Sequence, residues 1–258
     1  YFWTHNSAPS TAYVDPFYGD YVINYNASDY ASWNSLGAVG SRGSAALSGG
    51  MVPNGYIAAG QGFFTRSSGT APSGDPVVFK NSMRSNINHQ FYRNATLLSA
   101  SNQNRQISSV EKHRIWLNLI SNSGVFNQIL IGYVDGATTG WDRTYDGVRL
   151  TDGVSSTFYS VIPEQNLVIQ GRPLPFDAND EVPLGFKTTA QENFSLRLDQ
   201  LDGLFETQDI FIEDKLLGII HNLKQSPYAF SSEVGTFNDR FVLRYNNSAL
   251  GTQNPKNQ

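Results

Sequence analysis

Short runs of β-branched and aromatic residues, separated by turn residues, recur along the second half of this 258-residue chain. The apolar runs 115–120 and 128–134 flank the turn Asn122-Ser123-Gly124, which predicts an antiparallel hairpin. In the run 194–198 apolar and polar residues alternate, so one face of that strand should be solvated. Further strands are expected at 158–162, 167–170, 210–213 and 241–245. Strands at this spacing are typical of a β-sandwich or jelly roll, so the sequence predicts an all-β fold with little helix.

The composition favours the same fold class. Charged residues make up only 16% of the chain, well below the usual quarter, whereas Tyr and Phe are abundant at 13 and 16 residues. Aromatic side chains fill pleated, half-buried surfaces, and the many Asn and Gly residues suit the turns between strands. No stretch is dominated by the residues that favour helices.

We expect two β-sandwich or jelly-roll-like modules. The first, over 1–100, is rich in Gly, Ser and Tyr, with a long surface loop at 35–50. Its strand candidates are 21–25, 56–59, 62–65 and 77–79. Residues 101–110 lose their apolar content and form the expected connector; alternatively, they are a long loop within one continuous sandwich. The second module is expected over 111–250, followed by a tail at 251–258.

Charge and residue usage exclude several classes of protein. The net charge is -4 and no basic run is present, which argues against a nucleic-acid partner. No apolar stretch approaches the roughly 20 residues that span a bilayer, so no transmembrane segment is expected. Cys is absent, which excludes disulfides, thiolate zinc sites and cysteine nucleophiles.

Long motifs in the second half resemble a known family. They occupy 111–119, 131–138, 167–176, 182–187, 213–217 and 235–245. These segments are similar to a β-sandwich region of large Bacteroidota proteins that are exported by the type IX secretion system. In those proteins the region precedes a C-terminal sorting signal (type C-like). In the first half, 1–6 and 57–64 are similar to segments just upstream in the same flavobacterial surface and adhesin-like proteins.

The resemblance implies an extracellular or outer-cell-surface protein that meets the type IX secretion machinery in transit. It also implies an opening strand before Tyr1 and a sorting domain after 250–252, neither of which the chain contains. We therefore expect a mature or truncated product of a longer polypeptide. The resemblance names no ligand, because such modules accompany both adhesins and polysaccharide-active enzymes.

A polar loop with a prominent aromatic residue is the first candidate binding site. Asp135, Trp141, Asp142, Arg143 and Tyr145 lie within it. Trp141 and Tyr145 would provide a stacking platform for a sugar ring, and the charged side chains would hydrogen-bond to its hydroxyls. In the alternative interpretation Trp141 packs down as the loop's anchor while Asp142 and Arg143 pair with each other.

A second candidate is a calcium site in the run 177–181. Asp177, Asn179, Asp180 and Glu181 place four oxygen-bearing side chains in five positions, and Ca²⁺ takes six to eight oxygen ligands. The alternative is a turn between strands, in which Asp and Asn cap their own backbone. No other cofactor is expected.

No motif for catalysis is found, and we expect the chain not to be an enzyme. The four His residues, at 5, 89, 113 and 221, show no metal-binding spacing, and no GxSxG motif is present. Glycoside hydrolysis needs two carboxyl groups on opposite sides of the scissile bond. Nothing in the sequence indicates that carboxylates such as Glu164, Glu192, Glu206 and Glu213 form such a pair. Asp239 and Arg240 are interpreted as a structural ion pair or turn lock, with Arg240 satisfying loop carbonyls.

The leading hypothesis is therefore a non-catalytic extracellular protein segment, adhesin-like or structural, exported by type IX secretion. Its surface would bind through Tyr, Asn and Ser rather than through charge, with a polysaccharide or a neighbouring surface protein as partner. One alternative is a carbohydrate-binding module that serves an upstream polysaccharide-active enzyme. Another is a subunit of a self-assembling surface filament or sheath, joined through an unpaired sheet edge.

Overall fold

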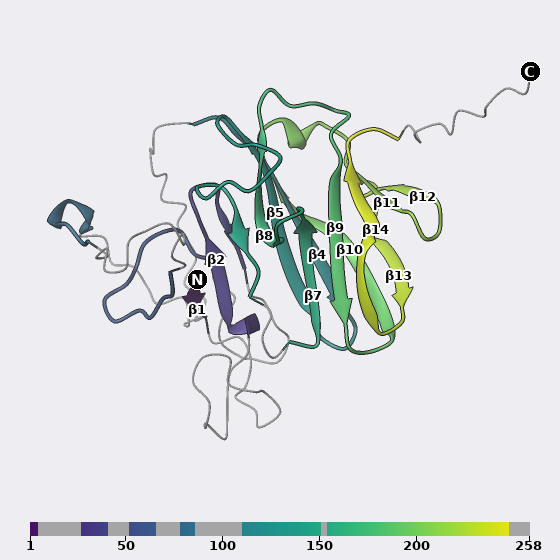
Figure 1. Cartoon of the computed structure of the whole chain (residues 1–258), viewed down its shortest axis with the longest axis horizontal. Coiled ribbons are helices and arrows are strands. Elements are labelled where there is room, and N and C mark those ends of the chain that lie inside the picture. The colour runs from purple at the N-terminus through teal and green to yellow at the C-terminus, as the bar shows by residue number, and fades with distance from the viewer. Residues whose placement is uncertain (5–26, 41–51, 66–77, 86–109, 151–153, 248–258) are drawn as a thin grey trace, which may run out of the picture.

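The computed structural model describes residues 1–4, 27–40, 52–65, 78–85, 110–150 and 154–247, and their regular secondary structure is nearly all β (Figure 1). Near the N-terminus, β1 (Phe2–Trp3), β2 (Tyr30–Trp33) and β3 (Ala38–Val39) form a three-stranded sheet. Helical structure in the described residues is limited to three 3-10 turns, η1 (Ala27–Asp29), η2 (Asn81–Met83) and η3 (Gly203–Glu206). The all-β prediction is confirmed, and no helix among the described residues is long and apolar enough to cross a membrane.

The other described strands form one eleven-stranded sheet that curls until it is nearly closed. They are β4 (Lys112–Ser121), β5 (Phe126–Val134), β6 (Gly147–Val148), β7 (Ser156–Val161), β8 (Asn166–Pro173), β9 (Val182–Thr188), β10 (Glu192–Leu201), β11 (Phe211–Asp214), β12 (Ile219–Asn222), β13 (Tyr228–Ser232) and β14 (Gly235–Arg244). Their order across the sheet is β12-β11-β14-β9-β7-β8-β5-β4-β10-β13, with β6 paired to β8. Because β5 and β8 run parallel, the loops that follow them leave the sheet at the same edge.

The strands predicted in the second half are present. The hairpin β4–β5 places Trp116 opposite Leu130 and turns at Gly124, whose φ of 99° suits glycine. In β10 the side chains of Phe194 and Leu196 are buried and Arg197 is exposed, which confirms the half-buried strand. The sequence patterns therefore located the central strands correctly.

The principal core lies between the two halves of the curled sheet and is rich in aromatic rings. Phe186 from β9 contacts the rings of Phe194, Phe230, Phe237 and Phe241, with ring centroids 4.9–5.9 Å apart. These rings come from β10, β13 and β14 as well as β9, so they join both halves of the sheet. Large buried aromatic rings contribute much of the apolar area that stabilises a fold of this kind.

A second core covers the opposite face of the sheet. Leu36 and Val39 pack there against strand residues. Trp116 donates its indole N–H to the carbonyl of Ala38 at 2.8 Å, and Arg114 donates to the carbonyl of Leu36 at 3.0 Å. The strand residues of this core are Trp116, Leu130, Val134, Val168 and Ile169. The segment 34–40 is therefore part of the same folded unit as the large sheet.

The expectation of two sandwich modules is not confirmed. The described N-terminal residues form a small sheet whose strand β3 contacts β5 and β8 of the large one, and Figure 1 shows β2 beside the large sheet. Of the strands expected there, 56–59 is not a strand and 62–65 contributes only a bridge between Phe63 and Phe2. Residues 78–79 are not in a strand, and the expected loop at 35–50 includes β3. Residues 21–25, 101–109 and 251–258 lie outside the described residues.

Arg240 is a structural residue, but its partner is not Asp239. Its guanidinium forms a fully buried ion pair with Asp214 of β11 at 2.8 Å and also donates to the carbonyl of Ser231 at 3.2 Å. Tyr228 donates its hydroxyl to the same Asp214 carboxylate at 2.9 Å. The buried charges are thus paired and hydrogen-bonded, which burial of a carboxylate and a guanidinium requires.

Replacing Gly132 by Val should detach the segment 34–40 from the large sheet. A Cβ at Gly132 would lie 2.7–2.9 Å from side-chain atoms of Leu36, which is fully buried. Overpacking of this kind costs about 1–3 kcal/mol. We expect a lower free energy of unfolding in urea, and faster amide hydrogen exchange over 34–40 measured by mass spectrometry.

The matched control is Gly62→Val, because a Cβ at Gly62 meets no atom within 4 Å. This variant should stay within about 0.5 kcal/mol of the wild type. Unchanged exchange over 34–40 in Gly132→Val would show that this segment does not depend on close approach to β5.

Candidate ligand-binding cleft

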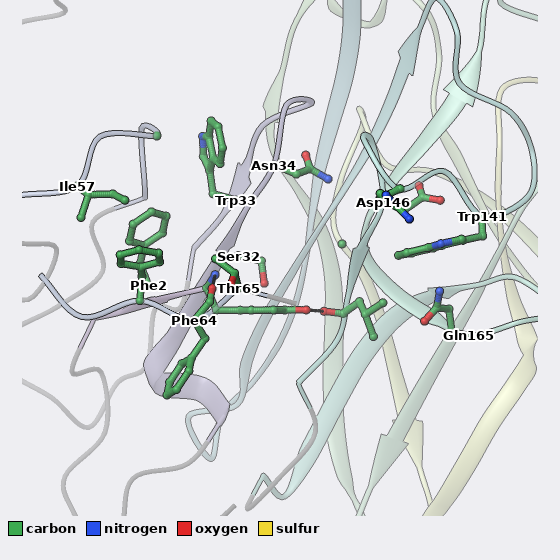
Figure 2. A pocket seen from close by; sticks show the side chains of 16 residues that line it. Phe2, Ser32, Trp33, Asn34, Ile57, Phe64, Thr65, Trp141, Asp146 and Gln165 are labelled. Atoms are coloured by element: carbon green, nitrogen blue, oxygen red, sulfur yellow. Dashed lines mark hydrogen bonds between the residues drawn. The ribbon is translucent and has the colours of Figure 1, made fainter. Parts of the chain in front are cut away.

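A cleft of about 520 Å³ lies between the three-stranded sheet and the loop that joins β5 to β6 (Figure 2). This volume falls in the range of about 300–1,000 Å³ that is common for small-molecule sites. Its lining combines aromatic and polar side chains, contributed by Tyr1, Phe2, Ser32, Trp33, Asn34, Gly55, Ile57, Phe63, Phe64, Thr65, Trp141, Arg143, Asp146, Gly147, Val148 and Gln165. Trp33, Ile57 and Phe2 lie on one side in Figure 2, and Trp141, Asp146 and Gln165 on the other.

Trp33 stands at the end of β2, on the N-terminal side of the cleft. It pairs with Ala38 of β3, and its side chain is 42% exposed. Gly55 lies against it: a Cβ there would come within 2.6 Å of the indole ring. The φ of Gly55 is 86°, a conformation that other residues rarely adopt. Glycine at position 55 therefore allows the backbone at this position to pack directly against the Trp33 indole.

Trp141 stands on the opposite side, in a loop fixed by its own hydrogen bonds. The backbone N–H of Asp142 donates to the Asp146 carboxylate at 2.7 Å, and the N–H of Thr138 donates to the Asp142 carboxylate. The N–H of Gly140 donates to the Thr138 hydroxyl at 3.2 Å. These contacts order the backbone on both sides of Trp141, whose side chain is still 38% exposed.

Hydrogen bonds also join the two sides of the cleft. Three of them connect the N-terminal part to the segment 144–148: Tyr1 Oη to the carbonyl of Val148 at 2.6 Å, Asn34 Nδ2 to the carbonyl of Tyr145 at 2.7 Å, and Ser35 Oγ to the carbonyl of Thr144 at 2.5 Å. The Asn34 side-chain oxygen in turn accepts from the N–H of Leu36 at 2.9 Å. The separation of the two tryptophans is thus set before any ligand arrives, and preorganisation of this kind favours binding.

The structure separates the predicted binding residues into two groups. Trp141 and the exposed Arg143 line the cleft. Asp135, Asp142 and Tyr145 support the loop instead: Asp142 caps its backbone, and the Tyr145 hydroxyl donates to the carbonyl of Asp135 at 3.1 Å. The ring of Tyr145 packs on the second core, so it does not form a platform with Trp141.

Asp146 lies at the base of this loop and is buried. Its two carboxylate oxygens accept the backbone N–H groups of Gly171, at 2.8 Å, and Asp142, at 2.7 Å. Burial raises the pKa of Asp146 to about 6, and the nearby Asp142 carboxylate acts in the same direction. The two backbone donors and the charge of Arg172 lower that pKa and offset part of the effect. Asp146 is therefore a structural anchor whose charge changes in mildly acidic solution.

Asp180, in the run expected to bind calcium, is neutralised by a cation of the protein itself. Arg172 donates its Nε to the carboxylate at 2.9 Å, and Tyr133 donates its hydroxyl at 2.6 Å. Burial raises the pKa of Tyr133 far above its ordinary value, with Tyr245 and Asp180 adding to the effect, so Tyr133 stays protonated. Among the described residues no group of three or more His, Cys, Asp or Glu is placed to hold a metal ion.

The other members of that run also have protein partners. Glu181 pairs with Arg244 at 3.1 Å, and Asp177 accepts the backbone N–H of Asn179 at 2.8 Å. The Asn179 side-chain oxygen accepts from Asn246 at 3.3 Å. These contacts match the alternative interpretation of 177–181 as a turn capped by its own side chains.

Several cleft residues were not among the sequence predictions. Trp33, Ser32 and Tyr1 come from the N-terminal part and meet a loop more than 100 positions away, as the Asn34–Tyr145 bond with a separation of 111 residues shows. An aromatic residue at the end of a short strand, followed by Asn34 and Ser35, was the available signal. It does not indicate which distant segment lies opposite.

The fold and the cleft define an all-β chain with a preorganised aromatic site of ligand size. The chain belongs to the family described as a domain of unknown function, DUF8693, whose model matches residues 1–245. No curated protein and no solved structure matches the chain.

The charge of Asp146 should make stability depend on pH in a specific window. The folded-state pKa of about 6 exceeds the ordinary 3.8, so between these values the folded state binds more protons than the unfolded state. The contribution of Asp146 to the free energy of unfolding therefore falls by ~3 kcal/mol as the pH rises through this window and is constant above it. The difference in free energy of unfolding between wild type and Asp146→Asn, measured against pH, checks this.

The control for this measurement is Asp135→Asn, since Asp135 is exposed. The fall is assigned to Asp146 if the difference between wild type and Asp135→Asn lacks it. Carboxyl ¹³C NMR of the wild type provides an independent reading, and a midpoint near 4 for Asp146 would contradict the prediction.

Proposed function

We propose that this chain is a non-catalytic recognition segment of an extracellular, adhesin-like surface protein, exported by type IX secretion, and that it binds its ligand in the Trp33–Trp141 cleft. The observation that carries the proposal is the pair of half-exposed indoles on opposite sides of one cleft. Exposed aromatic side chains held by a rigid frame are typical of recognition sites, because they bury a large area with little loss of conformational freedom.

The chemistry of the lining supports binding rather than catalysis. Among the described lining residues Asp146 is the sole carboxylate, and both of its oxygens accept backbone N–H groups. General acid–base hydrolysis of a glycosidic bond needs two carboxyl groups on opposite sides of the bond. The described lining also contains no His to act as a general base.

Export and surface location rest on the family resemblance of the second half. The segments that carry it, such as 111–119, 131–138 and 235–245, contribute to β4, β5 and β14 around the principal core. These second-half segments contribute no lining residue to the cleft, whereas the first-half segments 1–6 and 57–64 contribute Tyr1, Phe2, Ile57, Phe63 and Phe64. The resemblance therefore supports the inference that this chain shares the family's export route. It does not identify the ligand, which is inferred from the residues of the cleft.

Replacing either tryptophan should remove most of the binding. The whole chain would be applied to an array of immobilised neutral glycans, acidic glycans and extracellular-matrix proteins. We expect at least one of these to be bound, and expect Trp33→Ala and Trp141→Ala to bind it at least tenfold more weakly, because each variant loses one aromatic face. Surface plasmon resonance on the bound component gives the dissociation constants.

A suitable control is Leu217→Ala, which removes an exposed apolar side chain, 56% exposed, from the β11–β12 turn. It should bind like the wild type, and all variants should show wild-type circular dichroism. A partner held equally well by both tryptophan variants would place recognition outside the cleft and overturn the proposal.

A further inference from the structure

The lining of the cleft combines aromatic side chains with uncharged hydrogen-bonding groups. Figure 2 shows the indole of Trp141 extending from its loop toward the side that carries Trp33. Trp141 is 38% exposed and Trp33 is 42% exposed, so part of each residue is accessible to a ligand. The face of an aromatic ring carries negative charge density, so it attracts C–H groups whose hydrogens carry partial positive charge. One side of a pyranose ring presents such C–H groups.

Four groups in the cleft have no hydrogen-bond partner among the described residues. They are the indole N–H groups of Trp33 and Trp141 and the hydroxyls of Ser32 and Thr65. The indoles can only donate, whereas the hydroxyls can both donate and accept. A ligand rich in hydroxyl groups matches this set. A purely apolar ligand would exclude water from these groups and leave them unpaired, which is unfavourable.

Charge and strand pairing argue against the other main classes of ligand. Arg143 is the sole cationic side chain among the described lining residues, and a polyanion would need several. The carboxylate of Asp146 is already engaged with Gly171 and Asp142. An extended peptide would bind by adding to an open strand edge. However, β2, which carries Trp33, is already paired on both sides by β1 and β3.

From these observations we infer that the cleft binds a neutral glycan, whose sugar rings lie against Trp33 and Trp141 and whose hydroxyls bond to the indole N–H groups, Ser32 and Thr65. This inference rests on the proposed function of the cleft as a recognition site. A volume of about 520 Å³ suits a short stretch of oligosaccharide, and the openness of both tryptophans to solvent lets a longer chain continue beyond it.

The test is isothermal titration of the whole chain with neutral oligosaccharides, namely cello-, manno-, xylo- and chito-oligomers, and with alginate and heparin fragments as anionic probes. We expect binding to at least one neutral series. Its affinity should change less than twofold when salt is raised from about 50 to about 500 mM, because no ionic contact is screened. Trp33→Ala and Trp141→Ala should each weaken it at least tenfold.

The variant Trp141→Phe separates stacking from a merely structural effect. It keeps an aromatic ring but lacks the indole N–H, so it should recover part of the affinity lost in Trp141→Ala. Equal loss in both variants would mean that ring stacking is not the basis of binding. Leu217→Ala again serves as the unaffected control.

The outcomes distinguish this inference from the proposed function beneath it. Binding only to the anionic fragments, with strong weakening by salt, overturns the neutral-glycan inference. So does failure of every neutral series while an immobilised protein is still bound through Trp33 and Trp141; in that case the recognition cleft stands with a different ligand. Absence of any binding that depends on these two residues overturns both.

Discussion

Burial of both faces of the central strands is the constraint on which the rest of this structure depends. Ile129 and Ile131 of β5 face the principal core, whereas Leu130 between them faces the second core, and all three are fully buried. Without the segment 34–40 the outer face would expose more of Trp116 and Leu130, which lie against Ala38 and Gly37. Each Å² of apolar surface left in water costs about 25 cal/mol, so docking of this segment is driven by the sheet itself. Once it is docked, Asn34 and Ser35 lie within reach of the loop that carries Trp141.

Much of the large sheet was predictable because its strands follow local rules. The β4–β5 hairpin combines two apolar runs with a short turn, and β10 alternates. The strand β9 was missed, since Pro183 and Gly185 interrupt its apolar pattern. The structure explains this glycine: a Cβ at Gly185 would lie 2.4 Å from the ring of Tyr159 on the neighbouring strand. A requirement set by a partner strand is not visible in the local sequence.

The candidate site was predictable only on one side. A polar loop with one aromatic residue pointed to Trp141, which does line the cleft. Its neighbours Asp142 and Tyr145 were equally plausible ligands by residue type, and only three-dimensional contacts show that they hold the loop instead. Trp33 lies on the far side of the cleft because 34–40 packs on β5, a long-range contact that no local pattern encodes. The same limit applies to Arg240, whose partner Asp214 lies on another strand rather than beside it in sequence.

Stability and recognition are coupled in this arrangement. The hydrogen bonds from Tyr1, Asn34 and Ser35 to the segment 144–148 hold the N-terminal part in place and also set the distance between the two tryptophans. A ligand that contacts both Trp33 and Trp141 binds only while the N-terminal part is docked, so by mass action it favours the docked state. The second core in turn pre-forms the site and reduces the ordering that binding would otherwise require. Substitution of a few exposed side chains can therefore alter which ligand this cleft binds, because the buried strands maintain its shape.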